Sequence, residues 1–416
     1  MNATKSFDIS KQLVMNAYKA VKANAGAAGI DEESIKDFEK NLKDNLYKIW
    51  NRMSSGSYFP PLVKAVAIPK KSGGTRLLGI PTVADRVAQT VVKTMFEASI
   101  DPIFLTDSYG YRPGKSALDA VGVTRKRCWD YDWVLEFDIK GMFDNIDHEF
   151  LMRAVRKHTN CKWIILHIER WLKAPMQMPD GTKVERAKGT PQGGVISPIL
   201  ANLFMHYVFD VWITRKFPDC PWCRYADDGL VHCRSEQQAR VVQESLAQRL
   251  EECKLELHPD KTRIVYCKDA NRPGNYPHTE LNFLGYTFRP RVAKNSKTNT
   301  LFVSFTAAVS RRAQTAMKQR TRKMNLRNRS DLELEDISRM FNPILRGWDE
   351  YYGKYHPTGM GQVFKHFNSM LVAWAMRKYK RLKGRRRKAA LFITKNAREM
   401  PELFIHWQKG MVVATA

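Results

Sequence analysis

Two adjacent acidic residues, Asp227 and Asp228, stand between two short apolar runs in CRYADDGLVHCR (223–234). Short apolar runs on both sides of a turn signal predict a β-hairpin. Side chains of a strand alternate between faces, so both carboxylates can serve one site only where the turn redirects them. The alternative is a solvated Asp-Gly turn, since Asp-Gly is frequent in two-residue hairpins.

A third carboxylate, Asp138, lies near the end of another strand-like run, DWVLEFDIKG (132–141). If this strand lies beside the hairpin, the three carboxylates can hold two Mg²⁺ ions roughly 3.5–4 Å apart. Mg²⁺ prefers a few carboxylates together with substrate phosphates. The pattern predicts a site where one ion activates a primer 3′-hydroxyl and the other holds a triphosphate.

Two further segments carry groups suited to a nucleotide. The loop GTPQGG (189–194) precedes an apolar helix, and its glycines let the backbone and Gln192 approach a ligand closely. An ordinary helix entry with Pro198 in the first turn explains this loop as well. Lys70 and Arg76 lie on a predicted hairpin and can converge on a triphosphate, although a solvated basic hairpin is the simpler interpretation.

Composition narrows the partners. The 416 residues carry a formal charge of +27 and are 44% hydrophobic, which predicts a globular chain of two or three domains with a polyanionic partner. Nucleic acid fits this charge better than a membrane surface does. No apolar run has the length of a signal peptide or a membrane span. We therefore expect a bacterial cytoplasmic protein, including the nucleoid, with its seven cysteines reduced and with no membrane partner.

The periodicity predicts an α+β fold. Helices are expected over 8–55 and 84–102, after Asp147 as N-cap, and from Ser235 to about Cys253. Short strands between them predict an antiparallel sheet. A polar, turn-rich segment at 290–305 predicts the main boundary, and the remainder is helical, basic and aromatic. Nine of the twelve residues in 377–388 are Lys or Arg.

Seven blocks, in order, resemble the reverse transcriptases of mobile group II introns. They are LGIPTVADRVAQ (78–89), DSYGYRPGKSALDA (107–120), FDIKGMFDNIDH (137–148), GTPQGGVISPILANL (189–203), YADD (225–228), LHPDKT (257–262) and LNFLGYTF (281–288). The resemblance implies a right-hand polymerase fold. Residues 1–60 would extend the fingers, 61–295 form fingers and palm with an antiparallel sheet packed on helices, 305–400 form a helical thumb or X domain, and 401–416 form a tail.

The resemblance also implies roles for individual residues. Asp138, Asp227 and Asp228, with the backbone carbonyl of Ile139, would bind two Mg²⁺, for which Mn²⁺ can substitute. Lys70, Arg76 and Gln192 would contact the incoming dNTP. Phe143 would exclude a ribose 2′-hydroxyl, with packing in the core as the alternative.

Nucleic-acid contacts are the last implied set: Arg112, Lys261, Gly285 in a strand like the primer grip, Arg346, Arg385, Arg386 and Arg387. The implied partners are an RNA template, a DNA primer, dNTPs and group II intron RNA. By helical spacing, Trp348 is interpreted as a core residue more than as a stacking platform.

Several functions remain open at this stage. The first is an RNA-directed DNA polymerase that is also a maturase aiding splicing and retrohoming. The others are a domesticated or defence reverse transcriptase without an intron, and a splicing-only RNA-binding factor; Phe143 argues against an RNA-dependent RNA polymerase. An HNH endonuclease is not expected after 403–410. Cys220 and Cys223 form a CxxC, interpreted as a tight turn more than as a zinc site.

Overall fold

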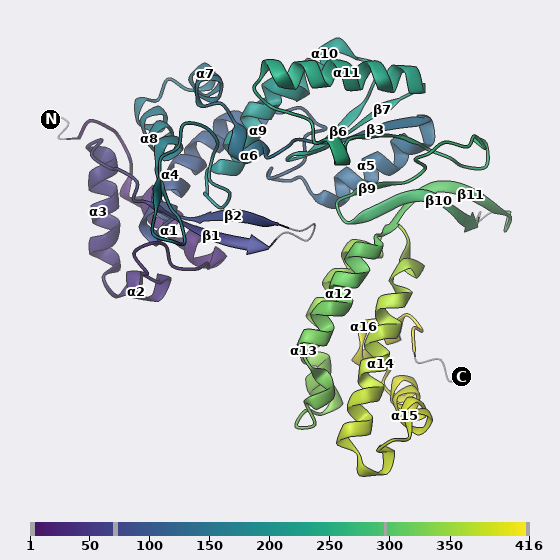
Figure 1. Ribbon diagram of the computed structural model, residues 1–416. Coiled ribbons are helices and arrows are strands. Elements are labelled where there is room, and N and C mark those ends of the chain that lie inside the picture. Colours follow the sequence, from purple (N-terminus) through teal and green to yellow (C-terminus); the bar gives the residue numbers. More distant parts are fainter. Residues whose placement is uncertain (1–4, 70–73, 295–297, 413–416) are drawn as a thin grey trace. The chain divides into compact units, whose positions relative to one another are not determined.

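The computed structural model describes residues 5–69, 74–294 and 298–412, which form two compact units (Figure 1). The first unit comprises residues 1–120 and 135–264, and the second comprises 121–134 and 265–416. These units do not by themselves delimit fingers, palm and thumb, so the domain bounds expected from the sequence stay predictions.

The first unit begins with three helices, as predicted: α1 (Lys11–Asn24), α2 (Ile35–Lys40) and α3 (Leu42–Ser54). Serine hydroxyls start two of them, because Ser10 and Ser34 accept hydrogen bonds from backbone amides in the first turn. The predicted hairpin also forms. Its strands are β1 (Val63–Pro69) and β2 (Thr75–Ile80), and the same sheet continues through β4 (Met176–Gln177) and β5 (Lys183–Val184).

The core of the first unit is built around α4 (Val83–Ile100), most of whose side chains are buried. Short helices follow the third strand: α6 (Met142–Asn145), α7 (His148–His158) and α8 (Lys162–Lys173). Asp147 caps α7 as predicted, accepting a 3.0 Å hydrogen bond from the Phe150 amide.

The apolar segment before the hairpin of Asp227 and Asp228 differs from the single long helix that we expected. It forms α9 (Ser197–Met205) and α10 (Val211–Lys216), separated by a π-helical turn at His206–Asp210. A π turn inserts a residue into the helix and is frequent at functional sites. Here it places Asp210, which is fully buried, among polar partners described below.

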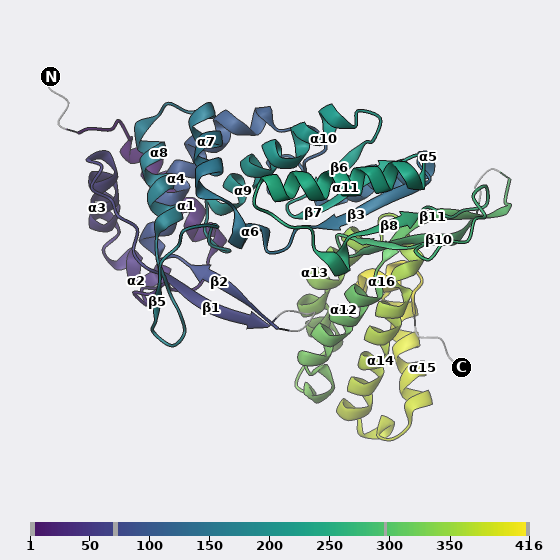
Figure 2. The ribbon, with the colours of Figure 1, turned by 45° about the horizontal axis from the view of Figure 1, so that its top comes forward.

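A four-stranded sheet has the order β6-β7-β3-β8, with β3 at Trp133–Asp138, β6 at Trp222–Tyr225, β7 at Asp228–Cys233 and β8 at Arg263–Tyr266. Helix α11 (Glu236–Glu252) lies across this sheet (Figure 2). Its predicted N-cap is confirmed, since Ser235 Oγ accepts from the Gln238 amide while Gln238 Oε1 accepts from the Arg234 amide.

The second unit contains helix α5 (Ala117–Asp130), which begins in the first, and a sheet of β9 (Leu281–Phe283), β10 (Tyr286–Lys294) and β11 (Leu301–Val309). The segment 290–305 was expected to be turn-rich, and this was wrong for most of it, because it contributes to the strands β10 and β11. The domain boundary expected there stays a prediction. Val292 pairs with Val303 and Pro290 with Phe305. These apolar residues share one face of the two paired strands, while the polar residues that alternate with them lie on the other face.

Helices complete the second unit: α12 (Arg311–Lys323), α13 (Leu334–Tyr352), α14 (Gly361–Lys378), α15 (Arg386–Glu399) and α16 (Ile405–Gln408). They enclose an aromatic core that includes Phe341, Phe364 and Trp374. The basic run 377–388 is not one helix, because α14 ends at Lys378 and α15 starts at Arg386.

The fold class is therefore α+β, as predicted, with antiparallel hairpins packed on helices in the first unit and a three-stranded sheet followed by helices in the second. Among the described residues, no helix is both long enough and apolar enough to cross a membrane.

Candidate active site

The hairpin that carries Asp227 and Asp228 is tightly specified. Tyr225 pairs with Asp228, so the turn consists of Ala226 and Asp227, with Ala226 in the left-handed region at φ 58°. Gly229, which follows Asp228 in β7, has no space for a side chain, since a Cβ there would lie 2.1 Å from the Phe137 ring. That close approach lets the strand bearing Asp138 pack directly against the strand bearing Asp228.

A buried arginine holds this turn, and the sequence reasoning missed it. Arg224 is 0% exposed and forms an ion pair with Asp210, with guanidinium-to-carboxylate distances of 2.7 Å for Nε and Nη2. Its Nη1 donates to the turn carbonyl of Ala226 at 3.0 Å and to Asn202 at 3.1 Å. Nη2 also donates to Ser108 Oγ. A signal was present in the sequence, since a charged residue within an apolar strand needs a buried partner.

The charge of Asp138 affects the pKa values of both Asp227 and Asp228. Burial raises the pKa of Asp227, the charge of Asp138 raises it further, and Arg76 and Lys261 oppose both effects. Desolvation, then the charges of Asp227 and Asp138, raise the pKa of Asp228 to about 7. Like charges held this close disfavour ionisation, so a cation that neutralised them would be bound favourably.

Asp138 is further fixed by the chain around 256–261. Its backbone carbonyl accepts from the His258 amide at 2.8 Å, and Ile139 forms a bridge with Leu257. The Lys261 ammonium forms an ion pair with Asp138 Oδ2. The structure thus places Lys261 on the Asp138 carboxylate, and its predicted contact with nucleic acid stays a prediction.

The donor set fits Mg²⁺ bound partly by substrate. Among the described residues, no group of three or more His, Cys, Asp or Glu side chains, the three aspartates included, is arranged so that protein ligands alone could hold a metal ion. Mg²⁺ is usually held by one or two carboxylates plus phosphates and waters, so a full protein cage is not required. Asp138, Asp227 and Asp228, with the carbonyl of Ile139, are the residues that would hold the ions.

The loop at 189–194 lies beside the hairpin of β1 and β2. The Gly79 amide donates to the Gln192 carbonyl at 2.7 Å, and a Cβ at Gly193 would lie 2.4 Å from the Gly79 carbonyl. This close approach brings Arg76 and Gln192 together, because Arg76 Nε donates to Gln192 Oε1. Two predicted nucleotide contacts therefore meet, while Lys70 lies outside the described residues.

A polar network behind the loop was also missed from the sequence. Gln89 Oε1 accepts from the Val195 amide at 2.7 Å, and Gln89 Nε2 donates to Asp85 at 2.9 Å. Asp85 in turn accepts from Tyr58 and Trp171, both at 2.8 Å. Burial raises the pKa of Asp85 despite these bonds. The network anchors the loop of Gln192 to the core helix α4.

Phe143 and Arg112 have different surroundings. Phe143 lies on α6, its side chain is buried, and its carbonyl accepts from the Thr190 amide at 2.7 Å. Both the predicted sugar selection and the core alternative therefore stay open. The Arg112 guanidinium is engaged by Asp101 and by the carbonyls of Leu105 and Ser108 at 2.8–3.4 Å. These bonds favour a structural role for Arg112, and its nucleic-acid contact remains only a prediction.

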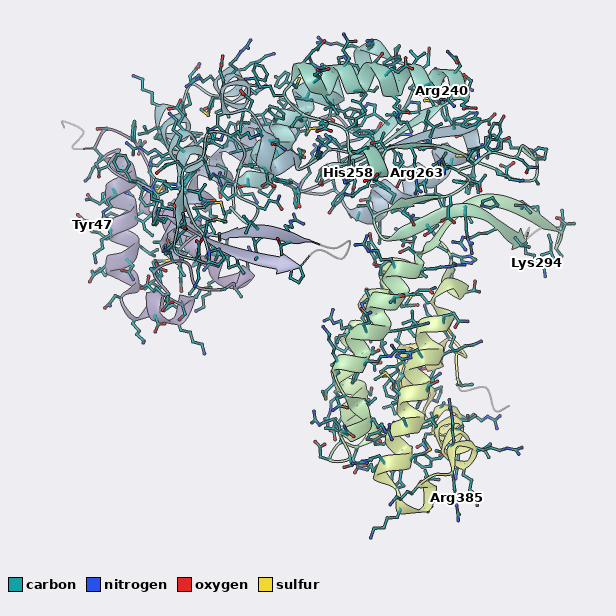
Figure 3. The ribbon with its side chains drawn as sticks, in the orientation of Figure 1. Tyr47, Arg240, His258, Arg263, Lys294 and Arg385 are labelled. Carbon is teal, nitrogen blue, oxygen red and sulfur yellow. The ribbon has the colours of Figure 1, made fainter. Side chains whose placement is uncertain are left out.

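The remaining predicted nucleic-acid contacts lie in the second unit. Gly285 has φ 82° in the turn before β10, where a Cβ would lie 2.9 Å from the Tyr352 hydroxyl. Arg346 is exposed on α13, and Arg385, Arg386 and Arg387 are exposed where α15 begins (Arg385 is labelled in Figure 3). Trp348 packs against the helical core, in line with its interpretation from spacing.

The two cysteines of the CxxC point to different partners. Cys220 lies 4.0 Å from Cys233 between sulfur atoms, whereas Cys223 faces the Ala120 carbonyl at 3.8 Å. A zinc ion needs its ligands to converge. The geometry therefore agrees with a turn leading into β6, where the Cys220 amide donates to the Phe217 carbonyl.

Comparisons with known proteins agree with this site. Residues 68–288 match the family described as reverse transcriptase (RNA-dependent DNA polymerase), and residues 314–392 match the group II intron, maturase-specific domain.

Two curated relatives are similar. Protein YkfC of Escherichia coli is 28% identical, covering 59% of this chain and 74% of its own. Group II intron-encoded protein LtrA of Lactococcus lactis is 34% identical, covering 48% of this chain and 34% of its own. A telomerase from Candida albicans, solved with a telomeric RNA fragment, aligns with 90% of this chain and 67% of its own at 12% identity and TM-score 0.47.

The buried ion pair of Arg224 and Asp210 allows a stability test. Arg224→Met leaves Asp210 buried without its charge partner and should cost about 3–5 kcal/mol of unfolding free energy. Arg224→Met with Asp210→Leu should recover most of that loss in urea denaturation, yet still lack the donor to the Ala226 carbonyl. We expect the double variant to need more Mg²⁺ than the parent for half-maximal thermal stabilisation. Parental Mg²⁺ dependence in the stable double variant would remove Arg224 from the positioning of the turn.

Charge crowding makes a second prediction. Asp228→Asn removes one negative charge and should raise the melting temperature in a chelator at pH 8, by about 2–4 °C for each kcal/mol of repulsion relieved. The folded-state pKa of Asp228 is raised, so the penalty is absent near pH 4 and grows as pH rises through about 7. The gain should therefore shrink at pH 5, and added Mg²⁺ should stabilise the parent more. A variant less stable than the parent at pH 8 would contradict the crowding.

Proposed function

Because the chain belongs to the reverse transcriptase (RNA-dependent DNA polymerase) family and carries a group II intron maturase-specific domain, we propose that it extends a DNA primer with dNTPs on an RNA template at Asp138, Asp227 and Asp228. The observation that carries the proposal is the hairpin turn of Asp227 and Asp228, which Arg224 holds and whose strand packs against the strand that ends at Asp138. Beyond the effect of burial, the charge of Asp138 raises the pKa values of both residues. A dead polymerase scaffold has no need to keep this repulsion.

The chain's own residues divide the work. When bound, Mg²⁺ would activate the primer hydroxyl and neutralise the charge of the leaving pyrophosphate. Arg224 keeps the turn in place so that Asp227 and Asp228 face Asp138. Arg76 presents a planar cation suited to bidentate contact with a phosphate, and its charge reaches Asp227.

Gln192 stands at the centre of the nucleotide-binding side of this proposal. It accepts from Arg76 and donates to Asp144 Oδ2 at 3.2 Å. Asp144 follows Phe143 directly. A short chain of contacts therefore joins Arg76, the proposed triphosphate ligand, to the helix that carries Phe143, the proposed sugar gate. The incoming dNTP would then be oriented by Arg76 and Gln192 and selected by Phe143.

A maturase role is the second part of the proposal. The matched domain at 314–392 covers α12 to α14 and half of α15, and this segment exposes Arg346, Arg385, Arg386 and Arg387. Exposed cations of this kind neutralise RNA phosphates. Group II intron RNA is the proposed partner, and splicing and retrohoming are the proposed processes. The competing candidate, a domesticated or defence enzyme without an intron, would lack this RNA partner.

The metal site can be tested by primer extension. Asp138→Ala and Asp227→Ala should each abolish single-turnover extension of a DNA primer on RNA, because each removes a ligand that the metal ions need. Template binding should persist, with Asp219→Ala, an exposed aspartate outside the site, as the control. Retention of a tenth of the parental rate by Asp138→Ala would remove Asp138 from the catalytic set.

Sugar selection tests Phe143. Phe143→Val should raise the ratio of rNTP to dNTP incorporation, because a smaller side chain leaves room for the 2′-hydroxyl. Measuring kcat/KM for both sugars gives the ratio, and a denaturation curve measures the loss of packing separately. If the ratio is unchanged while stability falls, Phe143 is a core ring only.

The maturase role predicts a salt effect. Replacing Arg385, Arg386 and Arg387 with Ala should lower the slope of log affinity for structured intron RNA against log salt by roughly two to three. Splicing assistance should fall more than extension on a short primer–template. Equal losses of splicing and extension would assign the three arginines to general grip on the template–primer.

A further inference from the structure

A hollow outside the candidate active site lies in the first unit. It is lined by residues of α7, α9, the π-helical turn and α11. Its volume is about 440 Å³, within the usual range for small-ligand sites. Its lining is mainly apolar and includes Ala154, Phe204 and Val208 together with the rings of Phe150 and Tyr207. The Tyr207 ring is stacked on one side with His158, at 5.8 Å between ring centres. None of its lining residues belongs to the candidate active site.

Cations stand along the α7 side of this hollow. Arg153 and Lys157 both line it, are exposed, and lie one helical turn apart. Among the described residues no ion pair with an acidic side chain engages either one. Lys157 instead lies 4.8 Å from the centre of the Tyr207 ring, and Arg153 lies 6.0 Å from that of Phe150.

On the α11 side, the charges are already used. Arg249 donates to the carbonyls of Tyr207 and Val208, both at 3.2 Å, and forms an ion pair with Glu252. Arg249 therefore fixes the π-helical turn that forms one wall, and Glu252 offsets its charge. The net positive charge offered to a ligand comes from Arg153 and Lys157.

An apolar, ring-lined hollow beside two unpaired cations matches one chemical class. An unpaired nucleotide has a flat base for the hollow and phosphates on both sides for the cations. An acidic peptide would satisfy the cations, but it does not need flat aromatic walls. A purely apolar ligand would leave both cations unused.

We propose that this hollow binds an unpaired nucleotide of single-stranded RNA, with the base among Phe150, Tyr207 and Ala154 and the flanking phosphates on Arg153 and Lys157. The site would hold RNA outside the polymerase centre. It goes beyond the proposed polymerase and maturase activities and does not depend on catalysis.

The test uses the full chain and fluorescein-labelled hexauridylate, with an abasic strand of the same length for comparison. Ala154→Trp should fill the hollow and weaken hexauridylate binding about tenfold, the effect of losing one stacked base, while abasic binding stays unchanged. Arg153→Ala with Lys157→Ala should lower the log–log salt slope by about 1.4, from two phosphates on a single strand.

The matched control removes two exposed cations elsewhere on the first unit, Arg240→Ala with Lys216→Ala, and should leave the slope unchanged (Arg240 is labelled in Figure 3). Photo-cross-linking of 5-iodouridine RNA to the parent should map to Phe150 or Tyr207. This cross-link and the Arg153–Lys157 variant decide the question if Ala154→Trp does not fold.

Three results would overturn the proposal. The first is parental binding of hexauridylate by a folded Ala154→Trp protein, and the second is cross-links that map only elsewhere. The third is loss of binding to a phenylalanine-containing polyglutamate peptide in Ala154→Trp without any change for RNA, which would assign the hollow to a protein partner. Extension on a short primer–template should stay parental in all variants, so a failure of this site is separable from a failure of the polymerase.

Discussion

The buried ion pair of Arg224 and Asp210 is the interaction on which the hairpin of Asp227 and Asp228 depends. Both side chains are fully buried, and the same guanidinium that neutralises Asp210 also donates to the turn carbonyl of Ala226. Burying two charges is costly unless their geometry and remaining hydrogen bonds are good, and here Ser108 and Asn202 supply those bonds. The π-helical turn follows from the same need, because it places Asp210 against the strand. The need to pair the buried Asp210 with Arg224 therefore shapes both the π-helical turn and the hairpin of the candidate site.

The ion pair of Arg224 and Asp210 opposes the electrostatic repulsion between buried carboxylates at the hairpin turn. Burial, and then the charges of neighbouring carboxylates, raise the pKa values of Asp227 and Asp228, so the site stores repulsion that a cation would relieve. Lys261 and Arg76 offset part of it from two sides. A tight turn, a glycine without room for a side chain and a buried arginine together hold a cluster that would otherwise spread.

The sequence predicted those parts of the structure that depend on local pattern. Alternating apolar runs around Asp227 and helix caps such as Asp147 and Ser235 have short-range signals, and the structure contains them. It could not predict the contacts of Arg224 and Gln89, because each depends on residues distant in the chain. The strands over 290–305 were missed for a related reason: polar letters between Val292 and Val303 hid an apolar face that appears only when the two strands pair. Lys261 was assigned to nucleic acid, and only the fold shows its carboxylate partner.

The central claim is that Asp138, Asp227 and Asp228 hold two catalytic metal ions beside a nucleotide oriented by Arg76 and Gln192. The most direct measurement is a structure of the chain with an RNA template, a DNA primer, a non-hydrolysable dNTP and Mn²⁺, with the ions located by anomalous scattering. We expect two Mn²⁺ peaks that contact these carboxylates and the triphosphate. An ordered nucleotide in place with no metal at the three carboxylates would contradict it.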